Sequence, residues 1–215
     1  MLTEKIKAVI FDFDGVVCNT DIYHYKSWEI IAKRLSIPFN QSINDKLRGK
    51  TRMQSLEILL GDDYYKYSQK DKEELYDEKN QLFIKLVSSI SRNDLAPDII
   101  WTLNKLKSKG IKIAIGSSSK NASFLLTKLG IVSLFDVVVD GNSIKNSKPN
   151  PEVFMNVSKK LGVSPKYCLV VEDSLVGITA GKQAGMCVAA IGAISNFIEA
   201  NYHITAVKDI MHLVE

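Results

Sequence analysis

The residues with the clearest potential for chemistry are two aspartates, Asp12 and Asp14, in the segment Phe11–Gly15. They come at the end of the apolar run Ala8–Phe11, which predicts a strand buried inside the protein. A buried carboxylate is unfavourable unless it is paired or bound to a metal. Two solvated aspartates in a turn are the structural alternative, but this interpretation does not explain why acids end a buried strand. The sequence therefore favours a functional pair.

A second acidic pair, Glu172 and Asp173, follows the apolar run Leu169–Val171. Oxygen ligands of this kind suit Mg²⁺, which takes one or two carboxylates together with waters and phosphate oxygens. The alternative is that Asp173 merely caps the helix predicted to begin at Ser174. One acid would be enough for a cap, so two acids that match the pair after the first strand favour a metal site.

Two further segments have residue types that suit an anion. The segment Ser117–Asn121 follows the apolar run Ile111–Ile115 and combines hydroxyls, backbone amides, a lysine and a predicted helix start. Such a combination can bind a phosphate, although a helix cap with a polar turn explains it equally well. In the segment Ser147–Pro149, Lys148 precedes another predicted helix and can neutralise a phosphate or a carboxylate. Most lysines are surface residues, so this segment is weak evidence alone.

The elements that position these residues are predicted from five short apolar runs, which have the pattern of buried parallel strands. The runs are Ala8–Phe11, Ile111–Ile115, Phe135–Val139, Leu169–Val171 and Val188–Ile191. Helical patterns lie between them, with ends marked by Asn121 and Gly130, by Asn150, Pro151, Glu152 and Gly162, and by Ser174 and Gly185. Alternating strands and helices predict an α/β sheet, in which ligands bind at the carboxyl ends of the strands.

The segment from about Asp21 to Ser89 has a different pattern, with apolar residues at helical spacing and no convincing strand. These residues are Trp28, Ile31 and Leu35, then Leu56, Leu59 and Leu60, then Leu75, Leu82 and Leu86. The polar, tyrosine-rich stretch Gly61–Lys72 is predicted to be a surface connection. The whole segment is therefore predicted to be an all-helical insert placed directly after the first strand.

The composition argues against several other classes of protein. The 215 residues are 46% hydrophobic and 24% charged, which is typical of a globular protein with a sizeable core. The net charge of +4 is spread without a dense basic stripe, so we expect no nucleic-acid partner, only a slight preference for anionic substrates. The cysteines Cys18, Cys168 and Cys187 are odd in number and form no CxxC, so neither a disulfide framework nor a zinc site is expected.

The location predicted from the sequence is the reducing environment of the cytoplasm. Cys168 and Cys187 lie in apolar runs and are predicted to be small core residues. The apolar run at the N-terminus is broken by Asp12 and Asp14, and no stretch approaches the length that a membrane span needs. We therefore expect neither a signal peptide nor a membrane association.

Taken together, the four motifs resemble those of the haloacid dehalogenase superfamily. DxDG after the first strand, a serine after the second, a lysine before a later helix and an acidic pair after the fourth strand are similar to its four motifs. The resemblance covers essentially the whole chain. It implies a HAD-like Rossmannoid core of α/β class with a parallel sheet at residues 1–17 and 90–215, and an inserted all-helical cap domain at residues 18–89.

Within that superfamily the chain resembles the β-phosphoglucomutase family. The matching stretches are Asp12–Val17, Tyr23–Trp28, Leu47–Arg52, Ser117–Asn121, Ser147–Pro149 and Glu172–Ser174. Those from the cap matter most, because superfamily phosphatases share the core motifs. The resemblance implies an enzyme that interconverts β-D-glucose 1-phosphate and glucose 6-phosphate. It also implies one Mg²⁺ per chain and β-glucose 1,6-bisphosphate as the activating intermediate. The expected partner is a small-molecule sugar phosphate, and we expect a monomer.

The same resemblance implies roles for the core residues. Asp12 would be the nucleophile and Asp14 the general acid and base. The magnesium ligands would be the side chains of Asp12, Glu172 and Asp173, with the main-chain carbonyl of Asp14. The transferring phosphoryl group would be held by Ser117 and Lys148.

The resemblance also implies a second phosphate site. Its residues would be Arg52, Ser119 and Asn121, with help from Lys120, and further substrate contacts would come from His24, Trp28, Arg48 and Gly49 of the cap. Trp28 is as consistent with a place in the cap core as with a substrate wall. Ser118 completes the predicted substrate-binding set, although the family often has alanine at this position.

Three functions are compatible with these motifs. They are a sugar-phosphate mutase, a phosphatase of the same fold acting on a sugar phosphate or another small ester, and a non-catalytic sensor of phosphorylated metabolites. A sensor would have no need of a nucleophile, so the intact acidic pairs count against it. Arg52 and the second phosphate site distinguish the mutase from the phosphatase, because hydrolysis of a monophosphate needs only one phosphate site.

Overall fold

All neighbouring strands of the sheet run parallel. After each strand the chain must therefore cross back to the end of the sheet at which the next strand begins. The computed structural model describes residues 5–192 and 199–214. Its sheet has the strand order β3-β2-β1-β4-β5-β6. The strands are β1 (Ala8–Phe11), β2 (Lys112–Gly116), β3 (Val137–Val139), β4 (Cys168–Glu172), β5 (Cys187–Ile191) and β6 (Tyr202–Ile204). The predicted α/β class with a parallel sheet is confirmed.

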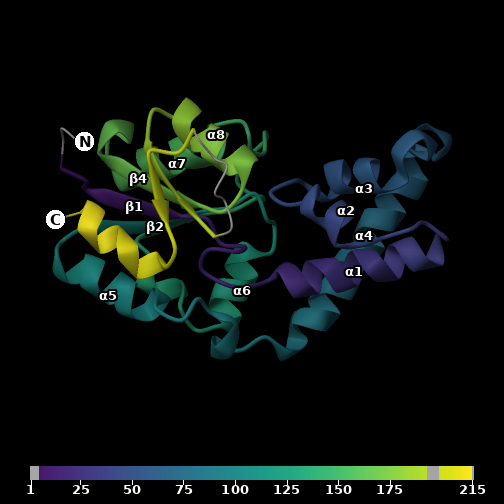
Figure 1. Ribbon diagram of the computed structural model, residues 1–215, viewed down its shortest axis with the longest axis horizontal. Helices are drawn as coiled ribbons and strands as arrows, with labels where there is room; N and C mark the ends of the chain where they lie inside the picture. The colour runs from purple at the N-terminus through teal and green to yellow at the C-terminus, as the bar shows by residue number, and fades with distance from the viewer. Residues whose placement is uncertain (1–4, 193–198, 215) are drawn as a thin grey trace. The chain divides into compact units, whose positions relative to one another are not determined.

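Helices cover both faces of this sheet (Figure 1). They are α5 (Ile99–Ser108), α6 (Ala122–Lys128), α7 (Glu152–Leu161) and α8 (Leu175–Gln183), with short 3₁₀ helices η3 (Arg92–Asp94), η4 (Val132–Leu134), η5 (Pro165–Tyr167) and η6 (Val207–Leu213). Ala8 and Ile10 of β1 pack with α7 and α8 in one apolar cluster. Because side chains alternate along a strand, Val9 and Phe11 face the opposite side, and all four are fully buried.

The helix ends follow the sequence signals in part. Ser174 caps α8, since its side chain accepts a hydrogen bond from the N–H of Gly177, and Gly162 ends α7 in the left-handed conformation. Pro151 takes the N-cap position of α7, one residue later than predicted, and Asn150 Oδ1 accepts from Glu152 N instead. Asn121 stands at the N-cap of α6 but makes no side-chain capping bond.

Residues 20–90 form a separate compact unit, and residues 1–19 and 91–215 form the other. The first of these, called the helical unit below, contains α1 (Asp21–Arg34), α2 (Gln41–Asp45), α3 (Arg52–Leu60), η1 (Gly61–Lys66), α4 (Gln69–Leu86) and η2 (Val87–Ser89). Its described residues contain no strand, as predicted. The buried residues of its core are Trp28, Ile31, Ala32, Leu47, Leu56, Leu59, Leu60 and Leu75.

Other details also differ from the sequence predictions, including the start of β3 at Val137 and not at Phe135. The stretch Gly61–Lys72 is mostly exposed, as expected of a surface connection, but it is largely helical, because it contains η1 and the first turn of α4, which begins with a capping box at Ser68. The edge strand β6 was not predicted. Cys187 is only half-buried at the start of β5, whereas Cys168 is buried as expected. Within the described ranges, no helix combines the length and apolarity that crossing a membrane requires.

Candidate active site

The acidic pairs meet at the point where the strand order reverses. From β1 the chain proceeds to β2 and β3 on one side of the sheet, and then returns to place β4 on the other side of β1. Phe11 pairs with Val171, so Asp12 and Glu172 leave adjacent strands at the same level. In open α/β sheets ligands bind at this switch point, outside the carboxyl ends of the strands.

A buried lysine connects the two acidic pairs. Lys148 Nζ lies 2.6 Å from Asp12 Oδ1 and 2.5 Å from Glu172 Oε1. The side chains of Lys148 and Glu172 are 2% and 0% exposed, and that of Asp12 is 11% exposed. Breaking such a buried pair leaves an uncompensated charge, which costs several kcal/mol. The surface-lysine interpretation of Lys148 is therefore wrong.

The electrostatics of this cluster follow from its burial. Removal from water raises the pKa of Asp12 to about 7, against the lowering effect of Lys148, and the nearby carboxylates Glu172 and Asp14 raise it further. Burial alone would lower the pKa of Lys148, but the charges of Asp12 and Glu172 outweigh burial and raise it above the usual lysine value. The lysine thus keeps its proton, while Asp12 is poised to change charge near neutral pH.

Glu172 is fixed through both of its carboxylate oxygens. Its Oε2 accepts hydrogen bonds from the N–H groups of Asp173 and Ser174 at 3.0 and 3.1 Å and from the Ser174 hydroxyl at 2.9 Å. These donors lie at the start of α8, where the helix dipole favours a negative charge. Glu172 is therefore fixed by three donors at one oxygen and by Lys148 at the other.

The predicted metal ligands converge. One carboxylate oxygen from each of Asp12, Glu172 and Asp173 lies within 4.8 Å of the others. An all-oxygen set of three acids suits Mg²⁺ and not a softer metal. The side chain of Asp14 is outside this set, and the role of its carbonyl stays a prediction. Asp14 itself is half-buried, and its charge acts on Asp12.

The loop Ser117–Asn121 follows β2, the neighbour of β1 on the other side. Ser117 is 1% exposed, and its hydroxyl accepts a hydrogen bond from the N–H of Ser119 at 3.0 Å. The Ser119 hydroxyl accepts in turn from the N–H of Asn121 at 3.2 Å. The hydroxyls thus shape the backbone of this loop, in addition to any contact with an anion.

Ser118 links the loop to the lysine. Its hydroxyl accepts a hydrogen bond from the N–H of Lys148 at 3.3 Å. Ser118 therefore joins the predicted phosphate loop to the backbone of the residue that contacts Asp12 and Glu172. An alanine at this position would lack that link.

In the helical unit, His24 and Trp28 lie beside a buried lysine. Lys79 is 2% exposed, with Nζ 2.8 Å from His24 Nδ1 and 5.3 Å from the centroid of the Trp28 ring. Because an ammonium group only donates, His24 accepts through Nδ1. His24 also stacks on Phe83, with ring centroids 4.2 Å apart. Trp28 is 3% exposed, which supports its place in the core of the helical unit.

Lys79 is a buried polar residue that was not predicted from the sequence. It lies in the highly charged helix α4, whose buried residues are Leu75, Lys79 and Phe83. These are spaced four apart, so the available signal was a lysine in the apolar stripe of an amphipathic helix.

The remaining predicted residues of the helical unit lie in the connection between α2 and α3 and at the start of α3. Arg48 forms ion pairs with Asp21 and Asp45. Gly49 has a φ of 70°, in the left-handed region that favours glycine. Arg52 is the first residue of α3, after a capping box at Thr51. It is half-buried, and burial lowers its pKa against the opposing effects of Asp77 and Tyr76.

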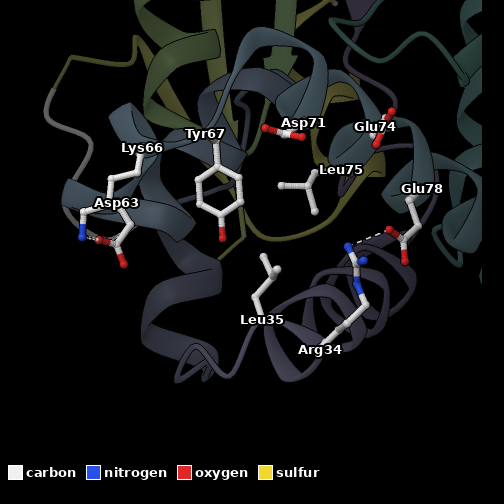
Figure 2. A pocket seen from close by; sticks show the side chains of 9 residues that line it. All are labelled: Arg34, Leu35, Asp63, Lys66, Tyr67, Asp71, Glu74, Leu75 and Glu78. Carbon is white, nitrogen blue, oxygen red and sulfur yellow. Dashed lines mark hydrogen bonds and ion pairs between the residues drawn. The ribbon is translucent and has the colours of Figure 1, made fainter.

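The helical unit also has a pocket of about 580 Å³, shown in Figure 2. It is lined by Arg34, Leu35, Asp63, Lys66, Tyr67, Asp71, Glu74, Leu75 and Glu78. Its two basic side chains are paired with acids of the same pocket, Lys66 with Asp63 and Arg34 with Glu78 (Figure 2). The pocket contains none of the predicted site residues, so its size does not make it the candidate active site.

A parallel α/β sheet with acids and a buried lysine at its switch point, and with a helical unit inserted after β1, defines a phosphoryl-transfer type of enzyme. The comparison with protein families agrees: the family model of the haloacid dehalogenase-like hydrolases matches residues 9–191. The chain belongs to this family and is an enzyme.

Three individual proteins show how this chain relates to other members of the family. It is 40% identical to the β-phosphoglucomutase of Bacillus subtilis over 189 residues, which is 87% of this chain and 84% of that protein. It is 32% identical to a phosphorylated carbohydrates phosphatase of Thermotoga maritima, over 84% of this chain and 82% of that one. The crystal structure of the β-phosphoglucomutase from Clostridium difficile matches with a TM-score of 0.90 and 37% identity, over 95% and 93% of the two chains.

Proposed function

We propose that this enzyme is a β-phosphoglucomutase, which interconverts β-D-glucose 1-phosphate and glucose 6-phosphate through β-glucose 1,6-bisphosphate. The observation that carries the chemistry is the cluster of Asp12, Lys148 and Glu172 at the switch point, with Asp173 beside it. The likeness to two β-phosphoglucomutases, at 40% and 37% identity, supports the choice of reaction. The predicted cytoplasmic, monomeric state is part of this proposal.

The first task of the site is to offset charge. A phosphate monoester is a dianion and repels a carboxylate nucleophile, so cations must lie at the point of attack. Lys148 supplies one such charge and is held there by Asp12 and Glu172. Mg²⁺, bound by Asp12, Glu172 and Asp173, would supply further positive charge to the same phosphoryl group.

The covalent step takes place on Asp12. When Asp12 carries the phosphoryl group, the 6-hydroxyl of β-glucose 1-phosphate attacks the phosphorus, the bond to the Asp12 oxygen breaks, and Asp14 takes the hydroxyl proton. The resulting bisphosphate then presents its 1-phosphate. Asp12 attacks it, the bond to the sugar oxygen breaks, and Asp14 returns the proton to that oxygen. Glucose 6-phosphate leaves and the phosphorylated enzyme is restored.

The phosphate that is not being transferred needs its own binding groups. We propose Ser119, Lys120 and Asn121 of the core and Arg52 of the helical unit for this role, with His24, Arg48 and Gly49 as further substrate contacts. Arginine has the planar, permanently charged fork that suits a phosphate. Ser117 would contact the transferring group together with Lys148.

The second candidate function is a phosphatase acting on a sugar phosphate or another small ester. It is favoured by the 32% identity to a phosphorylated carbohydrates phosphatase over most of both chains. The same aspartyl phosphate would then be hydrolysed by water. The two functions share Asp12, Asp14 and Lys148, and differ in the need for a second phosphate site.

The test supplies β-glucose 1-phosphate, Mg²⁺ and catalytic bisphosphate, and measures glucose 6-phosphate against free phosphate. The mutase yields mainly glucose 6-phosphate, whereas mainly free phosphate would establish the phosphatase. Arg52→Ala should lower mutase activity roughly ten- to a hundredfold, as loss of hydrogen bonds to a charged group implies. Hydrolysis of an aryl phosphate, which has no second phosphate, should change much less.

Arg34→Ala is the matched control for Arg52, because Arg34 is an exposed arginine of the helical unit, paired with Glu78. It should leave both reactions unchanged. If Arg52→Ala also changes neither reaction, Arg52 does not bind the substrate. If both reactions fall in parallel while circular dichroism shows an intact fold, the second phosphate site assigned to Arg52 is refuted.

A further inference from the structure

The turn after β3 contacts the proposed phosphate loop along its backbone. Residues 140–143 form a tight turn, closed by a hydrogen bond from Ser143 N to Asp140 O at 2.9 Å. At its centre, Gly141 N donates to the carbonyl of Ser119 at 3.1 Å. The side-chain amide of Asn142 donates to the carbonyl of Lys120 at 2.9 Å. Two successive carbonyls of the loop therefore point towards this turn.

The direction of these carbonyls matters for an anion. A carbonyl oxygen carries a partial negative charge, so carbonyls aimed at a phosphate would repel it. Because the peptide group is planar and trans, the N–H of Lys120 points away from the side on which the Ser119 carbonyl lies. Among the residues that the structure describes, this N–H donates to no protein acceptor. It is thus directed away from the turn and available to an anion.

The turn is built to hold this arrangement. Asp140 is 5% exposed and accepts hydrogen bonds from the Ser123 hydroxyl at 2.5 Å, from Asn142 N at 3.0 Å and from Asn142 Nδ2 at 3.3 Å. Ser123 belongs to α6, the helix that follows the loop. Asp140 therefore fixes Asn142 and the first turn of α6 together.

Gly141 permits the close approach. A Cβ atom at this position would lie 2.4 Å from the carbonyl oxygen of Ser118 and 2.9 Å from Lys120 N. Both are backbone atoms, so any side chain here would displace the loop. The backbone of this turn and the side chain of Asn142 thus both contact the same short stretch, Ser118–Lys120.

We propose that Asn142, fixed by Asp140, is a positioning residue for the second phosphate: it turns the Lys120 carbonyl away and holds the loop so that the N–H of Lys120 faces the anion. The inference rests on the proposed function, because it assigns a phosphate to this loop. It adds a residue that contacts neither the substrate nor the acids of the first phosphate site. Asn142 is exposed, so its replacement leaves the core intact.

The experiment compares two replacements of Asn142. Asn142→Ala removes the amide, and Asn142→Asp keeps the shape but cannot donate to the Lys120 carbonyl. Asn142→Ala should raise the half-saturating concentration of β-glucose 1,6-bisphosphate about two- to tenfold, the loss that one neutral hydrogen bond implies. Asn142→Asp should raise it at least as much, because its carboxylate also repels Asp140 and the Lys120 carbonyl. The kcat and KM for p-nitrophenyl phosphate should stay within about twofold in both variants.

Asn146→Ala is the matched control. Asn146 is an exposed asparagine of the following segment, and its amide donates to Glu152 and not to the loop. It should leave both reactions unchanged. If the Asn142 variants match the unsubstituted enzyme, or lose both reactions equally while folded, the positioning role is overturned.

Failure of the proposed function has a separate signature, which is an unsubstituted enzyme that forms no glucose 6-phosphate. In that case the amide signal of Lys120 in ¹⁵N-labelled enzyme decides the inference, during a titration with glucose 6-phosphate. A saturable shift that needs at least a threefold higher concentration in Asn142→Ala supports the positioning role. An unchanged titration, or no shift of the Lys120 amide in either enzyme, refutes it.

Discussion

Replacing Lys148 by methionine tests the central electrostatic argument, because it removes the charge and keeps most of the volume. Lys148 makes two charge-assisted hydrogen bonds, 2.6 Å to Asp12 and 2.5 Å to Glu172, and is 2% exposed. Hydrogen bonds to charged groups contribute about 1.5–3 kcal/mol each, and breaking a buried pair costs about 3–5 kcal/mol. We therefore expect Lys148→Met to lose about 3–5 kcal/mol of unfolding free energy without Mg²⁺.

The catalytic consequence has a defined sign. Without the lysine and before Mg²⁺ binds, nothing offsets the burial that raises the pKa of Asp12, so this pKa should move further above about 7. Less Asp12 is then ionised at neutral pH, and the transferring phosphoryl group loses a cation. We expect kcat to fall roughly a hundred- to a thousandfold, equally for mutase activity and for aryl phosphate hydrolysis, because both use this site.

The assay combines urea unfolding, with and without Mg²⁺, and both rate measurements on one preparation. Mg²⁺ should stabilise Lys148→Met more than the unsubstituted enzyme, since two carboxylates have lost their cation. Lys145→Met, at an exposed lysine of the same connection, is the control and should change nothing. A Lys148→Met enzyme that keeps a tenth of its activity, or its full stability without Mg²⁺, would refute the reasoning.

Two further predictions concern the acids. The apparent affinity for Mg²⁺ should fall about tenfold per pH unit below about 7. Burial raises the pKa of Asp12 to about 7, so below that pH a proton competes with the metal for this carboxylate. Calorimetric titrations between pH 5.5 and 8.5 check this, and a flat profile contradicts it. Asp14→Asn should slow the chemical step by about 10²–10⁴-fold while Mg²⁺ and bisphosphate still bind; equal loss of binding and turnover would instead make Asp14 a structural residue.

The strand ends were predictable because they depend on local sequence. The run Ala8–Phe11 is β1 to the residue, and Glu172 ends β4 where the acidic pair was expected. The edge strand β6 was not, since Tyr202–Ile204 contains His203 and forms no apolar run, unlike the equally short edge strand β3, Val137–Val139. Its formation depends on a neighbour that the local sequence does not reveal.

Contacts between segments that are distant in the chain could not be predicted from the sequence either. Lys148 was predicted to neutralise either a phosphate or a carboxylate, and the structure places it on two carboxylates. Lys79 and Asn142 were not singled out, because their significance lies in partners far along the chain, His24 and the Lys120 carbonyl. Residue type alone cannot distinguish such side chains from ordinary surface lysines and turn asparagines.

The glycine of the first motif shows how local and distant requirements combine. Gly15 has a φ of 86°, which a turn alone would explain. A Cβ there would also lie 2.1 Å from Asp173 Oδ2, and a Cβ at Gly177 would lie 1.9 Å from Glu172 Oε1. Each acid of the second pair thus occupies the space that a glycine leaves open. The acids can be packed this closely because the glycines present no side chain, so the two motifs specify one site jointly.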